Sequence, residues 1–320
     1  MVDRYSKIET LGSGTFGSAY KVRNLDTDRL CVLKKIPTRF KDVAINEYNI
    51  LKIFANDCFP YVVCLENFFE TPASSYIVLK YQENTYQLYS FIAKNDVQDI
   101  SVNYMIALGL VIGLIKIHSM GVLHRDIKPN NILIDPKTQM VTYIDFGGSC
   151  TVNDRDKFLE HVGASAYIDP RYLGNIMEND RKESISTPVT AERLKAVDVW
   201  ALGCVLFYVY TGKPIDMVLF PENEANINEK IIELTQDKID KTLKNHIKDE
   251  SSKFVAELIW PMLRIDWQER ITLESTLDRL YIMANFLIDK DIPTTEKLDE
   301  IIKKSKARAL VHVDKNTKKF

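Results

Sequence analysis

The chain has 320 residues, of which 46% are hydrophobic and 27% are charged, and its formal net charge is −2 at pH 7. These values are typical of a globular protein with a sizeable core, and they argue against a general binder of polyanions. The first residues lack the apolar stretch of a signal peptide, so none is expected, and the longest apolar run, Met105 to Ile115, is expected to be too short to span a membrane. The five scattered cysteines lack metal-ligand spacing, which favours reduced thiols. We therefore expect a cytoplasmic or nuclear protein without membrane association.

The first 82 residues predict a strand-rich unit. Short β-type runs flank a glycine-rich turn at residues 12–17, and further runs occur at residues 31–33 and 76–79. Apolar residues recur at helical spacing between residues 41 and 54, which predicts one helix among the strands.

From about residue 86 the helical period dominates the sequence. Helices are predicted at residues 101–120, 196–210 and 252–263, and the first two are apolar enough to be buried. Residues 172–195 are polar and predict a loop, with a break at Pro188.

This order of elements predicts two lobes and a terminal extension. A strand-rich lobe over residues 1–82 followed by a helical lobe over residues 83–285 gives an α+β fold, with a hinge near Asn84. Residues 286–320 are expected to be a separate unit, in which a short amphipathic helix follows Pro293 and the chain then becomes basic. Such a tail can contact anionic partners or serve nuclear import, and a solvated terminus is the favoured alternative.

The glycine-rich turn has Gly12, Gly14 and Gly17 between two predicted strands. Glycine allows the main chain to approach a phosphate group closely. A dinucleotide-binding fold would need a helix directly after this turn, whereas residues 18–22 continue as a strand, which favours a flap over phosphates. A plain hairpin turn is the alternative explanation of this motif taken alone.

Lys34 ends the next predicted strand. A lysine there can hold the phosphates of a nucleotide, provided that a carboxylate orients it, and Glu47 on the predicted helix is the candidate. The neighbouring Lys35 is expected to point away from the site, because side chains alternate along a strand.

Two further motifs carry the strongest functional signal. Residues 124–131 have the sequence HRDIKPNN, and residues 145–147 are Asp-Phe-Gly. Found in this order and at this spacing, together with the glycine-rich turn and Lys34, they make the chain resemble the eukaryotic-type protein kinases over roughly residues 5–285.

The resemblance implies a role for each polar residue of the two motifs. Asp126 would accept the proton of the substrate hydroxyl and position it, and Lys128 would contact the γ-phosphate, as in kinases specific for serine and threonine. Asn131 and Asp145 would hold magnesium. These residue types suit phosphoryl transfer, which depends mainly on positioning and charge neutralisation.

The resemblance also implies an ATP pocket between the lobes. Leu79 would be the gatekeeper, and the main chain of Lys80 and Gln82 would face adenine. Compared with the family, the residue sizes at Ala19 and Val32 are exchanged, so the pocket volume is nearly unchanged and nucleotide binding should survive. The expected cofactor-binding residues are Leu11, Gly12, Gly14, Gly17, Ala19, Val32, Lys34, Leu79, Lys80, Gln82 and Leu133.

The segment after the Asp-Phe-Gly motif departs from the family at two positions. Ala164 replaces a threonine, and Arg171 replaces a glutamate that normally pairs with a distal arginine, here Arg270. Two nearby arginines would repel each other, so this anchor must be rebuilt. Either Glu269 or Asp169 could supply the missing carboxylate.

Arg125, beside Asp126, usually implies control by a phosphorylated activation segment. The usual acceptor region, residues 155–162, nevertheless contains no serine, threonine or tyrosine. One hypothesis is that the carboxylate of Asp156 or Glu160 pairs with Arg125 and orders the segment without modification. An unpaired surface acid is the alternative, and Ser149, Thr151 and Ser165 remain possible phosphorylation sites.

The sequence thus predicts a magnesium- and ATP-dependent serine/threonine kinase that acts on protein substrates. The main rival is a pseudokinase scaffold, which binds nucleotide and partners without turnover, and a kinase for small molecules shares the fold. No specific nucleic-acid partner is expected.

Overall fold

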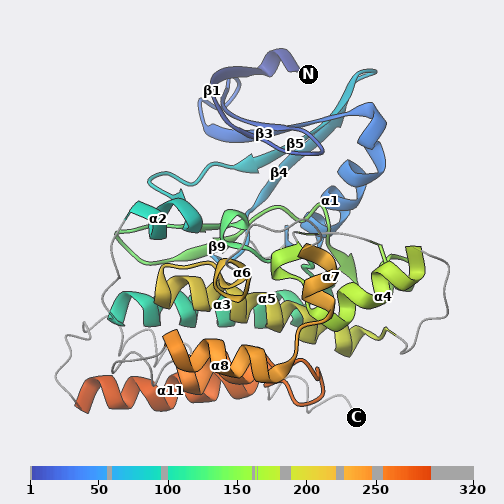
Figure 1. The fold of residues 1–320 in the computed structure, drawn as a ribbon. Helices are drawn as coiled ribbons and strands as arrows, with labels where there is room; N and C mark the ends of the chain where they lie inside the picture. Colours follow the sequence, from blue (N-terminus) through green and yellow to red (C-terminus); the bar gives the residue numbers. More distant parts are fainter. Residues whose placement is uncertain are drawn as a thin grey trace, which may run out of the picture.

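The structure is a computed structural model that describes residues 2–55, 60–94, 100–160, 163, 165–180, 189–220, 227–246 and 255–289. A strand-rich lobe formed by the N-terminal part of the chain lies above a larger helical lobe (Figure 1). The predicted two-lobed α+β fold is confirmed.

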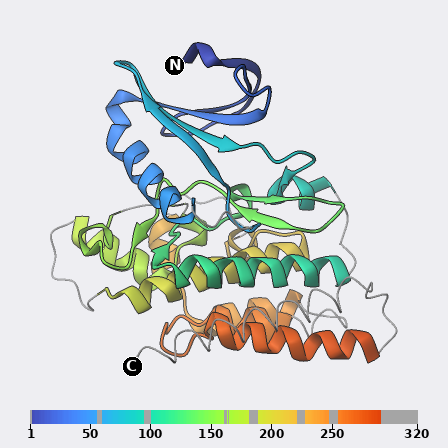
Figure 2. The ribbon, with the colours of Figure 1, turned by 180° about the vertical axis from the view of Figure 1, so that it is seen from behind.

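The N-terminal lobe contains an antiparallel sheet with the strand order β1-β2-β3-β5-β4. Helix α1 (Lys41–Phe54) crosses beside this sheet, at the position that the helical spacing predicted (Figure 2). The edge strand β4 was not predicted, because three of its six residues, Glu66, Asn67 and Glu70, are polar and exposed and interrupt the β-type pattern. The strands are β1 (Tyr5–Ser13), β2 (Ser18–Asn24), β3 (Leu30–Pro37), β4 (Leu65–Glu70) and β5 (Ser74–Lys80).

Side-chain alternation along β3 gives the sheet two different faces. Cys31 and Leu33 are buried with residues of β2 and β5 in a small core on the outer face. Val32 and Lys34 therefore lie on the opposite face, which is directed toward helix α1 and the helical lobe.

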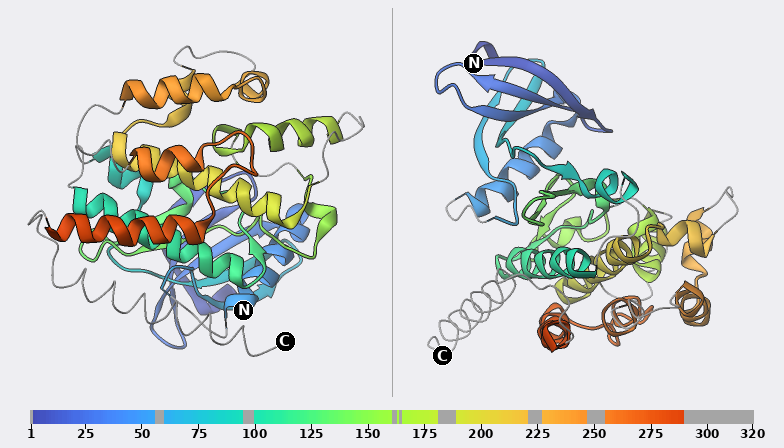
Figure 3. Two further views of the ribbon diagram at one scale, coloured as in Figure 1. Left: turned by 90° about the horizontal axis from the view of Figure 1, so that it is seen from below. Right: turned by 90° about the vertical axis from the view of Figure 1, so that its left-hand side faces the viewer.

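The helical lobe is built on two long, mostly buried helices, α3 (Ile100–Ser119) and α5 (Ala191–Thr211). Both are long and apolar enough to cross a membrane, but 61% and 83% of their most apolar windows are buried within the protein. Figure 3 shows α3 and α5 between the N-terminal lobe and the outer helices α8 and α11. Packing in the core accounts for their apolar composition.

The other helices surround this core. They are α2 (Leu88–Lys94), α4 (Pro170–Asp180), α6 (Ile215–Leu219), α7 (Ile227–Ile232), α8 (Gln236–His246), α10 (Trp260–Met262) and α11 (Leu273–Asp289). A π-helical turn, Val255–Ile259, precedes α10 within the segment that was predicted as one helix.

Short strands under the N-terminal lobe hold the loops that carry the sequence motifs. One sheet has the order β6-β8-β9, and a second pairs β10 with β7. These strands are β6 (Tyr86–Gln87), β7 (Val122–Leu123), β8 (Ile132–Ile134), β9 (Val141–Tyr143) and β10 (Cys150–Thr151). Residues 124–131 therefore connect β7 to β8, and residues 145–147 lie between β9 and β10.

The prediction of a loop over residues 172–195 was wrong at both of its ends. Helix α4 occupies its start because Leu173 and Ile176 bury one apolar face. Helix α5 begins at Ala191, where the side chain of Thr190 accepts a hydrogen bond from a main-chain N–H of the first turn. Pro188 lies outside the described residues.

The C-terminal extension is only partly described. Helix α11 continues to Asp289, four residues beyond the expected lobe boundary at residue 285. The helix expected after Pro293 and the basic tail both lie outside the described residues.

The cysteines also differ from expectation in one respect. Cys31, Cys150 and Cys204 are free, buried thiols. Cys64, in contrast, is disulfide-bonded, so the expectation of reduced thiols was wrong for this residue.

Candidate active site

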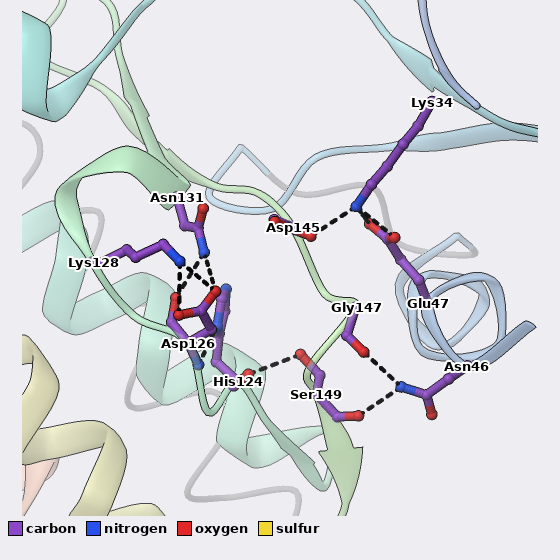
Figure 4. Close-up of polar contacts among 10 residues, drawn as sticks. All are labelled: Lys34, Asn46, Glu47, His124, Asp126, Lys128, Asn131, Asp145, Gly147 and Ser149. Atoms are coloured by element: carbon purple, nitrogen blue, oxygen red, sulfur yellow. Dashed lines mark hydrogen bonds and ion pairs between the residues drawn. The ribbon is translucent and has the colours of Figure 1, made fainter. Parts of the chain in front are cut away.

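An ion-pair cluster joins three segments that lie far apart in the sequence. The ammonium of Lys34 donates to both carboxylate oxygens of Glu47, at 2.8 and 2.6 Å, and to Oδ1 of Asp145, at 2.7 Å (Figure 4). The Glu47 side chain is only 1% exposed, whereas that of Asp145 is 44% exposed. The predicted contact between Lys34 and Glu47 is therefore present, and Asp145 turns an open edge toward the space between the lobes.

The opposite charges of Lys34, Glu47 and Asp145 favour the ionised forms that burial would otherwise disfavour. Burial by itself lowers the pKa of Lys34, but the two carboxylates outweigh it and raise that pKa above its ordinary value. Burial raises the pKa of Glu47, which the Lys34 ammonium opposes. The pKa of Asp145, which burial would raise, is held below its ordinary range by Lys34. Lys34 is thus a fixed positive charge, and Asp145 is ionised at neutral pH.

A second cluster surrounds Asp126 on the loop between β7 and β8. Lys128 donates to its two carboxylate oxygens, at 3.0 and 2.8 Å, and the amide of Asn131 donates to Oδ2, at 2.8 Å. The Asn131 amide also donates to the main-chain carbonyl of Asp126, at 2.9 Å. The Asp126 carboxylate is thereby fixed in orientation by Lys128 and Asn131 (Figure 4).

Asp198, in the interior of α5, holds the main chain of this loop. Its carboxylate accepts hydrogen bonds from the N–H groups of His124 and Arg125, at 2.9 and 2.8 Å, and lies 2.8 Å from the ring of His118. Arg125 and Asp145 both have a positive φ, 66° and 63°. Such strained conformations are common at functional sites, where the surrounding structure enforces them.

Phe146 packs between the two lobes. Its ring centroid lies 4.8 Å from that of His124 and 5.4 Å from that of Phe54 at the end of α1. Phe54 is a contact that the sequence motifs did not indicate.

The buried ring of His124 predicts a pH-dependent stability. Burial lowers the pKa of His124, against the opposing effect of nearby carboxylates, so the ring stays neutral in the folded protein while it gains a proton in the unfolded chain. The buried neutral ring of His124 therefore contributes its full stabilisation when the pH is above about 6.5, the pKa of histidine in the unfolded chain. This contribution is lost as the pH falls below that value. We expect the thermal midpoint of the native chain to fall more steeply than that of His124→Phe between about pH 7.5 and pH 5.5. Parallel midpoints for the two proteins in thermal unfolding would contradict this expectation.

The glycine-rich turn is held by a hydrogen bond within its own main chain and by one aromatic contact. The N–H of Gly14 donates to the carbonyl of Gly17, at 2.8 Å, and the ring of Phe16 packs edge-on against Phe40 just before α1. A Cβ at Gly17 would lie 2.2 Å from the carbonyl oxygen of Lys35, so only glycine fits there, whereas Cβ atoms at Gly12 and Gly14 would meet open space.

Most of the expected adenine-site residues share one face of the sheet. Ala19 lies opposite Lys34, and Val32 lies opposite Leu79, in the ladders of β2 with β3 and of β3 with β5. Leu11, on β1, is 45% exposed.

The remaining expected residues lie on the connection between the lobes and below it. The Gln82 carbonyl accepts a hydrogen bond from the Thr85 hydroxyl at 2.9 Å, and the N–H of Lys80 donates to the carbonyl of Cys64. Leu133 is half-buried between the fully buried Ile132 and Ile134, so it faces away from the helical core.

The anchor of the activation segment is rebuilt around Asp169. Its carboxylate lies 2.5 Å from the Arg270 guanidinium, and both side chains are almost fully buried. Of the two acids that the sequence offered, Asp169 is therefore the partner of Arg270. Arg171 is exposed, so the expected repulsion between two arginines does not arise. Asp169 also accepts a hydrogen bond from the N–H of Tyr172 and caps helix α4.

The hypothesis of a carboxylate beside Arg125 was wrong in its chemistry. Arg125 donates to the main-chain carbonyl of Glu160, at 2.7 Å, and to the hydroxyl of Tyr172, at 3.3 Å. That hydroxyl in turn donates to the carbonyl of Phe158, at 2.5 Å. Neutral oxygen atoms therefore hold this part of the segment. Ala164 lies outside the described residues.

The donor atoms of the site suit a magnesium–nucleotide complex. Asp145 and Asn131 offer hard oxygen ligands, and magnesium usually combines one or two such groups with phosphate oxygens rather than with a complete protein cage. Lys34 and Lys128 would add positive charge for the phosphates.

Comparison with known proteins agrees with this geometry. The chain is 29% identical over 234 residues to serine/threonine-protein kinase SCH9 of Saccharomyces cerevisiae, which covers 71% of this chain and 26% of that protein. It is 25% identical over 286 residues to serine/threonine-protein kinase Nek5 of Mus musculus, covering 88% and 41%. It is also 25% identical over 311 residues to calcium/calmodulin-dependent protein kinase type 1B of Rattus norvegicus, covering 95% and 82%.

The yeast and mouse relatives are thus much longer than the region that they share with this chain. The family model for the protein kinase domain matches residues 5–282, which include both lobes and every motif residue of the two clusters. This chain therefore belongs to the protein kinase family.

Proposed function

We propose that this protein is an active, magnesium- and ATP-dependent serine/threonine kinase that phosphorylates protein substrates. The observation that supports this most directly is the contact of Lys34 with both Glu47 and Asp145. Phosphoryl transfer in this family requires the lysine–glutamate pair and the magnesium-binding aspartate to be in place together.

Each residue then has a defined task. Lys34, oriented by Glu47, holds the α- and β-phosphates, and Asp145 and Asn131 bind magnesium. Asp126 would accept the proton of the substrate hydroxyl as that oxygen bonds to the γ-phosphorus, while the bond from this phosphorus to the β,γ-bridging oxygen breaks and ADP leaves. Lys128 would neutralise charge on the transferred group. ATP would thus supply the phosphoryl group, and magnesium, when bound, would neutralise charge on its phosphates.

The adenine ring is proposed to lie between the lobes. Ala19, Val32 and Leu79 would contact it from the sheet, with Leu11 and the glycine-rich turn above and Leu133 below. The main chain of Lys80 and Gln82 would supply its hydrogen bonds. A cytoplasmic or nuclear location also remains a proposal.

A pseudokinase scaffold is the alternative, and Ala164 and Arg171 are the features that favour it. The ion pair between Asp169 and Arg270 weakens that argument, because it anchors the segment without the glutamate that Arg171 replaces. The catalytic residues of both clusters are intact.

Binding and turnover of ATP test the proposal separately. We expect ATP with magnesium to raise the thermal midpoint, because a ligand at about 100 times its Kd stabilises the folded state by about 2.7 kcal/mol. We also expect transfer of the labelled γ-phosphate to the chain itself or to generic protein substrates, and loss of transfer when magnesium is chelated. A midpoint shift without transfer would favour the scaffold, and no shift would contradict nucleotide binding.

A further inference from the structure

Asn46, the residue before Glu47 on helix α1, connects this helix to the activation segment. Its amide nitrogen donates to the carbonyl oxygens of Gly147 and Ser149, at 3.3 and 2.9 Å (Figure 4). Its carbonyl oxygen accepts a hydrogen bond from the ammonium of Lys157, at 2.6 Å. One side chain therefore contacts three residues that lie about a hundred positions later in the sequence.

The residue type matters because a primary amide both donates and accepts. Asparagine is a poor residue for a helix interior, so a surface position would gain from most replacements. Here the donating NH2 group and the accepting carbonyl oxygen of Asn46 both form hydrogen bonds from helix α1 to the activation segment. The ammonium of Lys157 also lies 3.2 Å from the carboxylate of Asp154, so the cation that donates to the Asn46 carbonyl oxygen is held in place.

These contacts restrict the rotation of helix α1. Asn46 and Glu47 are consecutive residues on one rigid helix, so a fixed position for the first side chain limits where the second can point. The far end of the connection is also fixed, because the hydroxyl of Ser149 donates to the carbonyl of His124 in the catalytic loop, at 3.1 Å. Ser149 is 1% exposed.

None of these contacts needs a phosphate group. Residues 155–162 contain no hydroxyl side chain, and Arg125 donates through Nη2 to a main-chain carbonyl and to the Tyr172 hydroxyl, whereas its buried Nε and Nη1 have no hydrogen-bond partner among the described residues. In the described part of the segment, the partners of Asn46 are likewise two main-chain carbonyls and one lysine.

We propose that Asn46 is a positioning residue which, with Lys157, holds helix α1 so that Glu47 reaches Lys34, and that this connection forms without a phosphate on the activation segment. The inference rests on the proposed kinase function for its effect on turnover. The connection itself can be measured without turnover.

Two substitutions test the donating and the accepting group of the Asn46 amide separately. Asn46→Asp keeps an acceptor for Lys157 but loses the two donated hydrogen bonds and places a carboxylate against two carbonyl oxygens. Lys157→Met keeps the donated bonds and removes the cation. Asn49→Asp, on the exposed side of the same helix, and Arg155→Met, exposed in the same turn as Lys157, are the matched controls.

Kinetics of the full chain should show a selective loss. We expect kcat to fall about tenfold in Asn46→Asp and less in Lys157→Met, because a net loss near 1.4 kcal/mol corresponds to a factor of ten. The KM for the protein substrate should not change, and the controls should match the native chain. Native activity should also survive phosphatase treatment, and its loss would overturn the claim that no phosphate is needed.

Amide hydrogen exchange tests the connection independently of catalysis. We expect faster exchange of the amides in residues 41–54 in Asn46→Asp and Lys157→Met, with exchange in α3 unchanged. Unchanged exchange in α1, or equal effects of the control substitutions, would overturn the inference. If the native chain transfers no phosphate but α1 loosens as described, the proposed function fails and the connection stands.

Discussion

Replacing Asp126 by asparagine is expected to lower kcat by about a thousandfold, within the usual range for the loss of a general base. Asparagine has nearly the same size but cannot accept a proton. It would also present an amide to the two groups, Lys128 and Asn131, that donate hydrogen bonds to the native carboxylate. The reacting hydroxyl would lose both its proton acceptor and its orientation.

The measurement is transfer of labelled γ-phosphate under saturating magnesium and ATP. Binding of nucleotide should persist in Asp126→Asn, since Lys34 and Asp145 are unchanged, and the ATP-induced shift of the thermal midpoint checks this. Asp156→Asn makes the same change at an exposed position of the activation segment and should behave as the native chain. A rate for Asp126→Asn within tenfold of native would show that this carboxylate is not the base.

The largest expected loss of stability follows from replacing Asp169 by asparagine. The substitution leaves the Arg270 guanidinium buried without its counter-charge, which typically costs about 3–5 kcal/mol in the free energy of unfolding. The cap of helix α4 is affected less, because asparagine can still accept the hydrogen bond from Tyr172. Trp200 lies 5.1 Å from the Arg270 guanidinium, so its fluorescence should report the change.

A double-mutant cycle shows whether the loss in the free energy of unfolding comes from the ion pair between Asp169 and Arg270. Asp169→Asn combined with Arg270→Met removes both charges, so urea unfolding should give a loss smaller than the sum of the two single losses. Arg171→Ala, at the exposed position where the family has its glutamate, should change stability little. Additive losses in the cycle, or a large loss from Arg171→Ala, would contradict the assignment of Asp169 as the anchor.

Local patterns in the sequence predicted the parts of the site that one short segment determines. The helical spacing before Phe54 places Glu47 on the face toward β3, and alternation along β3 places Lys34 on the face toward α1. Their contact follows from two regular elements. The motif around Asp126 likewise needs only five residues of chain to bring Lys128 and Asn131 to one carboxylate.

The sequence was less informative where main-chain atoms or distant segments supply the partner. Arg125 binds a carbonyl oxygen, which every residue possesses, so no side chain near residue 160 could identify it. Two partners of Asn46 are likewise main-chain carbonyls, so the sequence alone gives no sign that it differs from an ordinary surface residue of a helix. For Arg270 the sequence offered two acids, and only the path of the chain into helix α4 selects Asp169 over Glu269.

Helix α4 was missed because its polar residues outnumber its apolar ones. Tyr172, Leu173 and Ile176 are sufficient to bury one face against the core, but four hydrophobic residues in eleven, beside five charged or amide side chains, resemble a polar loop. Tertiary packing, rather than composition, decides the structure of such a segment.

The left-handed main-chain conformations of Arg125 and Asp145 have a consequence for attempts to make this protein more heat-resistant. Each costs on the order of 1–3 kcal/mol for a residue with a side chain, and glycine would relieve most of that cost. Glycine at Arg125 would also remove the contacts of that side chain with the Glu160 carbonyl and the Tyr172 hydroxyl, and glycine at Asp145 would remove the contact with Lys34 and the proposed magnesium ligand. The main-chain strain at these two positions is therefore the cost of presenting side chains that hold the site together.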